Sequence, residues 1–286
     1  MQRRGLLLLA RFGILRCRFI TNVMLTDAFV TLLRFPGMRK RLWHRWYDFL
    51  ARRYRDSDWT FMNYGFQDAS VGYLKLEPAD ENDRSCIQLY NHVAGAVDLS
   101  NRRVLEVGSG RGGGCSFVAR YLKPARVTGV DLAERAIAFC KNRYRIHGLD
   151  FQTGDAENLP FADAAFDAVV NVESSHCYPD LGQFFREVLR SDGHFLYADL
   201  HERGTLNEWR DSLRASGLRI IRETDITPAV VRALDQDNER KSAVIDRLVP
   251  RVFRSSFYDF AGIRGSKIDR GFRSGSLAYF SFVAEK

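Results

Sequence analysis

The stretch RVLEVGSGRGGGCSFVARYLKPARVTGVD, residues 103–131, decides the fold of this chain. A short apolar run at residues 104–107 gives way to glycines, then to a helix-like segment, and then to a second apolar run. This order predicts a strand, a tight turn, a helix and a second strand. Gly108, Gly110 and Gly112 suit such a turn because glycine adopts backbone angles closed to residues with a Cβ, and because it lets a ligand approach the main chain.

The turn predicts a binding site for a nucleoside that carries a charged tail. The helix that opens after the glycines directs unpaired N–H groups and its positive dipole end toward a ligand. Asp131, at the tip of the second predicted strand, is placed to accept hydrogen bonds from the two hydroxyls of a ribose. Gly108, Gly110 and Gly113 also satisfy the GxGxxG pattern of dinucleotide-binding proteins, so a nicotinamide or flavin cofactor stays open on these residues alone.

Glu106, two residues before the first glycine, argues for a different cofactor. A carboxylate beside the loop would repel a pyrophosphate but suits a cofactor that carries an ammonium and a sulfonium group. Residues 104–112, VLEVGSGRG, resemble the first motif of the class I S-adenosylmethionine-dependent methyltransferases, hydrophobic-hydrophobic-acid-hydrophobic-Gly-x-Gly-x-Gly. The resemblance implies S-adenosylmethionine as cofactor, held by Glu106, Gly108, Gly110, Gly112 and Asp131. An NAD-dependent oxidoreductase is the less favoured alternative.

A second cofactor element follows the third predicted strand. The segment Gly154-Asp155-Ala156-Glu157 falls on the carboxyl edge of the sheet, where ligands bind in open α/β folds. The resemblance implies that Asp155 accepts a hydrogen bond from the adenine amino group while Ala156 offers its backbone. The alternative is that Asp155 only caps a turn, as acids after glycine often do.

Strand-like and helix-like segments alternate along most of the chain, which predicts a parallel sheet with helices on both faces. The predicted fold is therefore α/β, a doubly wound Rossmann-like sheet of the methyltransferase type with an N-terminal and an inserted helical cap. In the resembled family the final strand is antiparallel, which implies the same for residues 277–284. We predict a methyltransferase domain over residues 59–286, with the helical cap inserted at about 226–260 and followed by an Arg/Gly-rich loop through residue 276. The predicted strands are 103–107, 126–131, 149–153, 166–172, 193–199, 218–224 and 277–284, and the predicted helices between them are 112–122, 134–147, 179–190 and 205–216.

The positive charge of the chain is concentrated in its leader. The 286 residues carry a net charge of +8, yet residues 1–55 hold 13 Lys and Arg against 2 Asp and Glu, and the remainder holds 30 against 33. A core that gripped nucleic acid would be basic around its active site, so we expect no nucleic-acid partner. The five cysteines have no metal-ligand spacing, which favours a reducing compartment, a cytoplasmic location and no metal site.

Residues 1–58 are predicted to form a basic amphipathic helical leader or lid. The apolar run at residues 6–10 is cut by Arg11, so it is too interrupted to span a bilayer. The leader fits a surface helix packed on the domain, an organelle transit peptide, or an interfacial helix that brings residues 1–55 to an anionic membrane. Downstream, Tyr64-Gly65-Phe66 resembles the Tyr-Gly-aromatic element of sterol-type methyltransferases, and we expect Tyr64 to help close the cofactor site.

The acceptor side of the site is predicted from residues 166–180, FDAVVNVESSHCYPD. Here the chain resembles a subgroup of small-molecule and lipid methyltransferases that includes the mycobacterial phthiotriolone dimycocerosate O-methyltransferases. It resembles the rebeccamycin sugar O-methyltransferase more distantly, whose pattern Glu-Ser-x-His-His-x-Pro-Asp places its first histidine on His176. Cys177 replaces the second histidine, so the resemblance does not carry a two-histidine mechanism over to this chain. The acid of the next strand falls on Asp199.

These residues predict methyl transfer to a hydroxyl of a hydrophobic small molecule such as a polyketide, lipid or glycoside. An alcohol is a poor nucleophile until its proton is removed, and histidine titrates near neutral pH, so His176 is the expected general base with Asp199 as its partner. A capping role for His176, and His201 as a rival base, stay open. The alternative functions are C- or N-methylation of a sterol-like or amine substrate, the NAD-dependent oxidoreductase, and a membrane-docked binding protein without catalysis.

Overall fold

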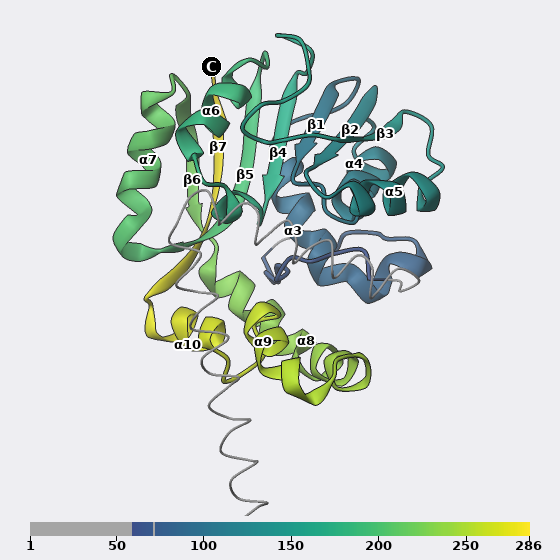
Figure 1. The fold of residues 1–286 in the computed structure, drawn as a ribbon, viewed down its shortest axis with the longest axis vertical. Coiled ribbons are helices and arrows are strands. Elements are labelled where there is room, and N and C mark those ends of the chain that lie inside the picture. Colours follow the sequence, from purple (N-terminus) through teal and green to yellow (C-terminus); the bar gives the residue numbers. More distant parts are fainter. Residues whose placement is uncertain (1–58, 71) are drawn as a thin grey trace, which may run out of the picture.

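Seven strands form one sheet in the order β3-β2-β1-β4-β5-β7-β6 (Figure 1). The computed structural model describes residues 59–70 and 72–286, so the predicted leader and its membrane contact lie outside the described residues. The strands are β1 (Arg103–Val107), β2 (Arg126–Asp131), β3 (Leu149–Thr153), β4 (Ala168–Val172), β5 (His194–Glu202), β6 (Arg219–Asp225) and β7 (Leu277–Glu285). The α-helices are α3 (Arg84–Ala94), α4 (Gly113–Tyr121), α5 (Glu134–Arg143), α6 (Leu181–Leu189), α7 (Leu206–Ala215), α8 (Thr227–Leu248), α9 (Arg254–Phe260) and α10 (Lys267–Ser274).

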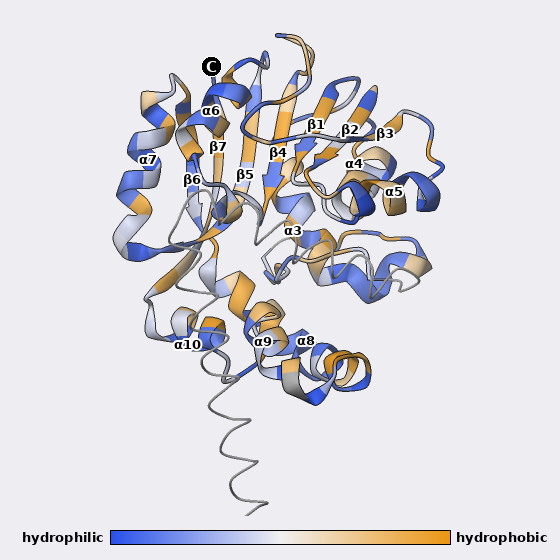
Figure 2. Ribbon diagram, in the orientation of Figure 1, coloured by the Kyte–Doolittle hydropathy of each residue, from blue (hydrophilic) through white to orange (hydrophobic). Residues whose placement is uncertain are grey.

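The inner strands β1, β2, β4, β5 and β7 are buried on both faces, which confirms the predicted doubly wound fold, whereas the edge strand β6 is mostly exposed. Along β1, Val104 packs against the cluster that contains α3, α4 and α5, whereas Leu105 packs against the cluster that contains α6 and α7. Successive side chains of a strand point to opposite faces, so a continuous apolar run is what a sheet covered on both sides requires. Figure 2 shows orange along the inner strands β4 and β7, whereas blue and orange residues alternate along the helices.

The last strand runs against its neighbours, as the resemblance implied. β7 pairs antiparallel with β5 from end to end and with β6 on its other side. This long pairing extends β5 to Glu202, beyond its predicted end at residue 199. It also sets Tyr279 opposite Leu200, so a residue close to the C-terminus reaches the carboxyl edge of the central strands.

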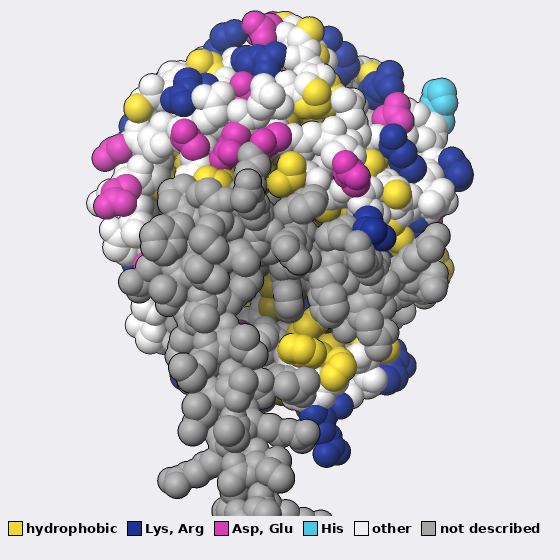
Figure 3. Space-filling view, in the orientation of Figure 1, with side chains coloured by type: hydrophobic (Ala, Val, Ile, Leu, Met, Phe, Trp, Pro, Cys, Tyr) yellow, Lys and Arg dark blue, Asp and Glu magenta, His cyan; other side chains and the backbone are white. Residues whose placement is uncertain are grey.

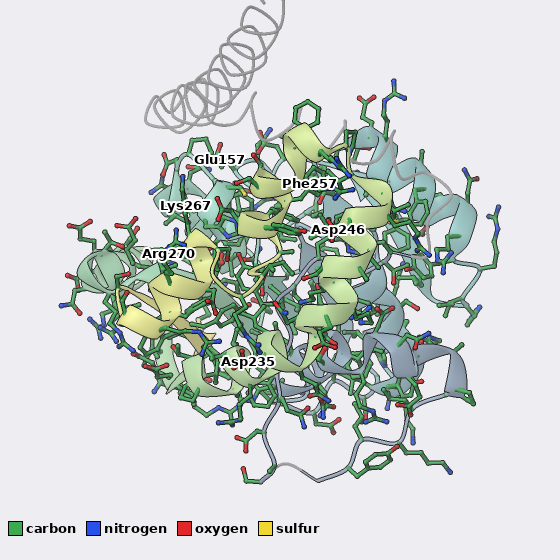
Figure 4. All side chains as sticks on the ribbon, turned by 90° about the horizontal axis from the view of Figure 1, so that it is seen from below. Glu157, Asp235, Asp246, Phe257, Lys267 and Arg270 are labelled. Carbon is green, nitrogen blue, oxygen red and sulfur yellow. The ribbon has the colours of Figure 1, made fainter. Side chains whose placement is uncertain are left out.

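Three helices, α8, α9 and α10, lie between β6 and β7 and form the cap below the sheet (Figure 1). Figure 4 shows them from below, with Asp235 and Asp246 on α8 and Lys267 on α10. The predicted Arg/Gly-rich loop is wrong over residues 267–274, which form α10. The side chain of Ser266 accepts a hydrogen bond from the backbone N–H of Asp269 and so caps this helix. Within residues 59–70 and 72–286, no helix is long and apolar enough to cross a membrane.

Candidate active site

The glycine loop forms the tight turn that the sequence predicted. Gly108, Gly110 and Gly112 all have positive φ, at 75°, 52° and 78°. A Cβ on Gly108 would lie 1.9 Å from Ser174 Oγ, and one on Gly110 would lie 2.6 Å from Met62 Cε. The loop therefore needs glycine both for its backbone angles and for the close approach of two other segments.

Glu106 is a buried carboxylate beneath the loop. It is 1% exposed, and its Oε1 accepts a hydrogen bond from Tyr90 Oη at 2.6 Å. Its Oε2 is buried without a hydrogen-bond partner among the described residues, as is the hydroxyl of Ser109. Burial raises the pKa of Glu106 to about 7. An unpartnered buried acceptor of this kind fits a cofactor with a cationic end and does not fit a pyrophosphate.

The remaining predicted cofactor residues are brought to the same edge. Asp131 Oδ2 accepts a hydrogen bond from Gly110 N at 2.8 Å, which fixes the acid beside the loop. The backbone of Gly154 donates to Asp131 O, so the segment with Asp155 and Ala156 lies next to it. The carboxylate of Asp155 accepts from the backbone N–H of Glu157 at 3.1 Å, which is the turn-capping contact.

Residues 59–66, here called the strap, lie over the glycine loop and continue along the carboxyl edge of the sheet to the end of β4. The guanidinium of Arg111 donates to the carbonyl of Trp59 at 2.5 Å, and Met62 lies against Gly110. At the other end, Tyr64 N donates to Glu173 Oε1 at 2.7 Å, and the Tyr64 ring packs edge-on against Phe272 of α10. The strap therefore links the glycine loop, the end of β4 and the cap, and Tyr64 lies at the end of the strap that contacts Glu173 and α10.

His176 and Asp199, predicted to form a pair, are in contact. His176 Nδ1 lies 2.8 Å from Asp199 Oδ1, and Asp199 Oδ2 accepts from Ser175 Oγ and from His176 N. Asp199 is fully buried, whereas the side chain of His176 is 31% exposed. Burial alone would lower the pKa of His176, but the charge of Asp199 outweighs it and raises the pKa well above its ordinary value. The pair can hold a proton on the imidazole and keep the ring in one orientation.

His201, the rival base, lies in a different environment. It is 8% exposed, its Nε2 lies 3.3 Å from Tyr197 Oη, and its ring packs edge-on against Trp209. Burial lowers its pKa below the ordinary value. Its surroundings are those of a core histidine, which favours His176 as the group that meets an acceptor.

Glu173 and Tyr279 lie at the candidate site, although the sequence analysis assigned them no role. Glu173 follows β4 with φ of 47°, a left-handed conformation that residues with a Cβ rarely adopt. Its Oε1 accepts from Tyr279 Oη at 2.8 Å as well as from Tyr64 N. Burial raises the pKa of Glu173 to about 7. An acid that directly follows a buried parallel strand was a usable signal for Glu173, whereas Tyr279 on a distant strand offered none.

Comparisons with known proteins agree with this geometry. A family model described as a methyltransferase domain matches residues 105–197. The chain is 40% identical over 250 residues to the phthiotriol/phenolphthiotriol dimycocerosates methyltransferase of Mycobacterium tuberculosis (strain H37Ra), which covers 86% of this chain and 93% of that protein. It is 42% identical over 211 residues to the fatty-acid O-methyltransferase of Mycolicibacterium smegmatis, which covers 73% of this chain and 77% of that protein.

Solved structures share the fold at low sequence identity. The [4+2]-cyclase SpnF has a TM-score of 0.65 at 20% identity, over 86% of this chain and 96% of that one. Geranyl diphosphate C-methyltransferase from Streptomyces coelicolor, solved with S-adenosyl-L-homocysteine, has a TM-score of 0.58 at 18% identity, over 84% and 98%. Fold alone does not fix chemistry, so the family rests on the closer relatives. The chain belongs to the S-adenosylmethionine-dependent methyltransferase family that includes the phthiotriol/phenolphthiotriol dimycocerosates methyltransferases.

Proposed function

We propose that this enzyme transfers the methyl group of S-adenosylmethionine to a hydroxyl of a hydrophobic, lipid-like acceptor, with His176 as general base. The observation that carries this proposal is the contact between His176 Nδ1 and the buried carboxylate of Asp199. The printed names of the relatives supply the acceptor class, since one acts on phthiotriol dimycocerosates and the other on fatty acids.

The cofactor site in this proposal is the half of the edge around the glycine loop. Glu106 would face the cationic end of S-adenosylmethionine, and Asp131 the ribose hydroxyls. Asp155 and Ala156 would face the adenine, and Tyr64 would help to close the site. The backbone approach to the cofactor would come from the three positive-φ glycines, Gly108, Gly110 and Gly112. S-adenosylmethionine supplies an electrophilic methyl carbon when it is bound.

The imidazole of His176 accepts the acceptor's proton in this scheme, so the active form of the enzyme has a neutral imidazole. Because the pKa of His176 is raised, this form gains population as the pH rises. The acceptor oxygen forms its bond to the methyl carbon while the bond from that carbon to sulfur breaks, with the electron pair staying on sulfur. The hydroxyl proton moves to Nε2 of His176, because Nδ1 is held by Asp199. Asp199 then stabilises the imidazolium that forms. Holding oxygen and methyl in line supplies most of the rate.

Two measurements test the proposal in sequence. Thermal unfolding with excess S-adenosylhomocysteine should raise the melting temperature, because a ligand that binds only the folded state at a hundred times its Kd adds about 2.7 kcal/mol. Transfer of labelled methyl from S-adenosylmethionine to a long-chain alcohol should then give a methyl ether. Stabilisation without any ether, but with a methylated amine or alkene, would favour N- or C-methylation instead.

We further propose that residues 1–55 bring the enzyme to an anionic membrane surface. Within the described chain the basic part is the cap: residues 227–276 hold 10 Lys and Arg against 6 Asp and Glu, whereas residues 59–226 hold 19 against 24. Hydrophobic side chains gather over α8 on the face in Figure 3, and Phe253 is 50% exposed. Sedimentation of the full chain with anionic but not with neutral phospholipid vesicles, weakened by salt, would support this contact.

A further inference from the structure

We propose that Glu173 selects the acceptor: its carboxylate admits a neutral hydroxyl and excludes an acceptor that carries a carboxylate of its own. The inference rests on the proposed function and deepens it, because it separates two acceptor classes that relatives of this chain use.

The carboxylate of Glu173 is fixed by two donors that converge on one oxygen. Tyr64 N donates to Oε1 from the strap at 2.7 Å, and Tyr279 Oη donates to the same atom from β7 at 2.8 Å. Among residues 59–70 and 72–286, none donates to Oε2. The left-handed backbone of Glu173 is a conformation that a tight fold keeps only where the surroundings enforce it. The Glu173 carboxylate is therefore held in one orientation, and its Oε2 stays available to an acceptor. Glu173 precedes His176 by three residues.

The charges around Glu173 make this part of the site negative. The titratable groups that act on it are Asp199 and His176, and these two form an ion pair with each other. From the cap, Lys241 Nζ donates to the carbonyl of Tyr64, and the charge of Asp259 acts on the Tyr64 side chain, so the cap adds one charge of each sign. With Glu173 ionised, the group carries a net charge of −1 while His176 holds a proton, and of −2 once His176 is the neutral base. A second carboxylate would meet like charge there, whereas a neutral alcohol would not, and the one hydroxyl hydrogen of the alcohol stays available to Nε2 of His176.

The protonation of Glu173 gives the selection a pH dependence with a definite sign. Burial raises its pKa to about 7, so the residue is largely ionised at pH 8 and largely neutral at pH 6. Carboxylate acceptors should therefore be rejected most strongly above pH 7. The ratio of kcat/KM for a fatty acid to kcat/KM for an alcohol should rise as the pH falls through 7.

The experiment compares a long-chain alcohol with the fatty acid of the same chain length, using the full chain and labelled S-adenosylmethionine. At pH 8 the wild type should methylate the alcohol in preference to the acid. Glu173→Gln keeps an oxygen that accepts from Tyr64 and Tyr279 but loses the charge, so its acid-to-alcohol ratio of kcat/KM should rise at least tenfold. Glu239→Gln, at an exposed position on α8, is the matched control and should keep the wild-type ratio.

Several outcomes would overturn the inference. They are a wild type that prefers the fatty acid, or a Glu173→Gln variant that loses activity toward both acceptors equally and keeps the wild-type ratio. Unchanged stabilisation by S-adenosylhomocysteine shows that the variant is folded. If Glu173→Gln does not fold, Tyr279→Phe is the second variant, because it removes one hydrogen-bond donor from the Glu173 carboxylate. It should also raise the acid-to-alcohol ratio of kcat/KM. An unchanged ratio would count against the inference. A wild type that methylates neither acceptor, although S-adenosylhomocysteine stabilises it, would instead overturn the proposed acceptor class.

Discussion

Most of the cofactor half of the carboxyl edge, from Glu106 to Asp131, comes from one continuous run of sequence, to which Asp155 and Ala156 are added from the end of β3. The acceptor half is assembled from four distant segments. Each half holds a glutamate whose carboxylate accepts a hydrogen bond from a tyrosine hydroxyl: Glu106 from Tyr90, and Glu173 from Tyr279. Burial raises the pKa of both glutamates to about 7. Glu106 is closed off by the core, whereas Glu173 is partly exposed at the edge. The two glutamates therefore have similar pKa values but different access: Glu106 is enclosed by the core, whereas Glu173 can meet an acceptor.

The sharpest test of this division is His176→Ala. Loss of a general base should lower kcat by about 100- to 10,000-fold. The affinity for S-adenosylhomocysteine should stay unchanged, because His176 belongs to the acceptor half. Calorimetric titration and methyl-transfer kinetics measure the two effects separately, with His147→Ala at an exposed turn as the control. A parallel loss of affinity for S-adenosylhomocysteine would show that His176 also serves the cofactor half.

Glu106→Gln tests how much the buried carboxylate of Glu106 lowers the free energy of unfolding when it is ionised. An ordinary glutamate pKa of 4.5 in the unfolded chain and one of about 7 in the folded chain mean that the folded state holds the extra proton between these values. The free energy of unfolding of the unliganded wild type should therefore fall by about 3 kcal/mol as pH rises from about 4.5 to about 7. The variant should lack this decrease and bind S-adenosylhomocysteine more weakly.

Chemical denaturation of both proteins at pH 5 and pH 8, without ligand, measures the difference. Glu173 contributes a decrease of the same sign in both proteins, so it cancels in the comparison. Equal pH dependence in the wild type and in Glu106→Gln would show that Glu106 is ionised without its ligand.

A substitution where the two halves touch should have a smaller effect. Gly108→Ala places a Cβ against Ser174 Oγ, in a backbone conformation with φ of 75°. Strain of about 1–3 kcal/mol should weaken S-adenosylhomocysteine binding by about tenfold or more. Gly204→Ala, which has nothing within 4 Å of its added Cβ, is the control. Unaltered affinity in Gly108→Ala, measured by calorimetry, would mean that the end of β4 moves freely away from the loop.

The smallest expected effect is that of Lys241→Met on the cap. Lys241 Nζ donates to the carbonyl of Tyr64 at 3.4 Å, which is a long hydrogen bond at a partly exposed position. Its loss should cost about 1 kcal/mol or less in stability. KM for the acceptor should rise by about twofold or threefold, because the strap end beside Glu173 loosens by a fraction of that energy. A larger rise in KM for S-adenosylmethionine would show that the cap serves the cofactor half.

How far the sequence predicted each half follows from how the half is built. The strand ends at residues 107 and 131 and the acid Glu106 could be read directly, because neighbours in sequence are neighbours in the fold. The pairing of His176 with Asp199 was reached through a resemblance, and the structure brings the two together. The contact between Glu173 and Tyr279 could not be predicted, since it depends on the register of β7 against β5.

One miss had a usable signal. The segment with α10 was predicted as a loop because glycines flank and interrupt it. Ser266 followed three residues later by Asp269 is a helix-start pattern, and the structure uses it as a cap. The glycines disfavour a helix here, but the Ser266 cap and packing on the end of β7 stabilise α10.

The position of the strap has a kinetic consequence. Because one segment lies over the glycine loop and ends on Glu173, the two substrates share a single covering element. We expect an ordered reaction in which S-adenosylmethionine binds before the acceptor and the methylated product leaves before S-adenosylhomocysteine. Product inhibition by S-adenosylhomocysteine should then be competitive toward S-adenosylmethionine and noncompetitive toward the acceptor, and at saturating acceptor the turnover would be set by strap opening.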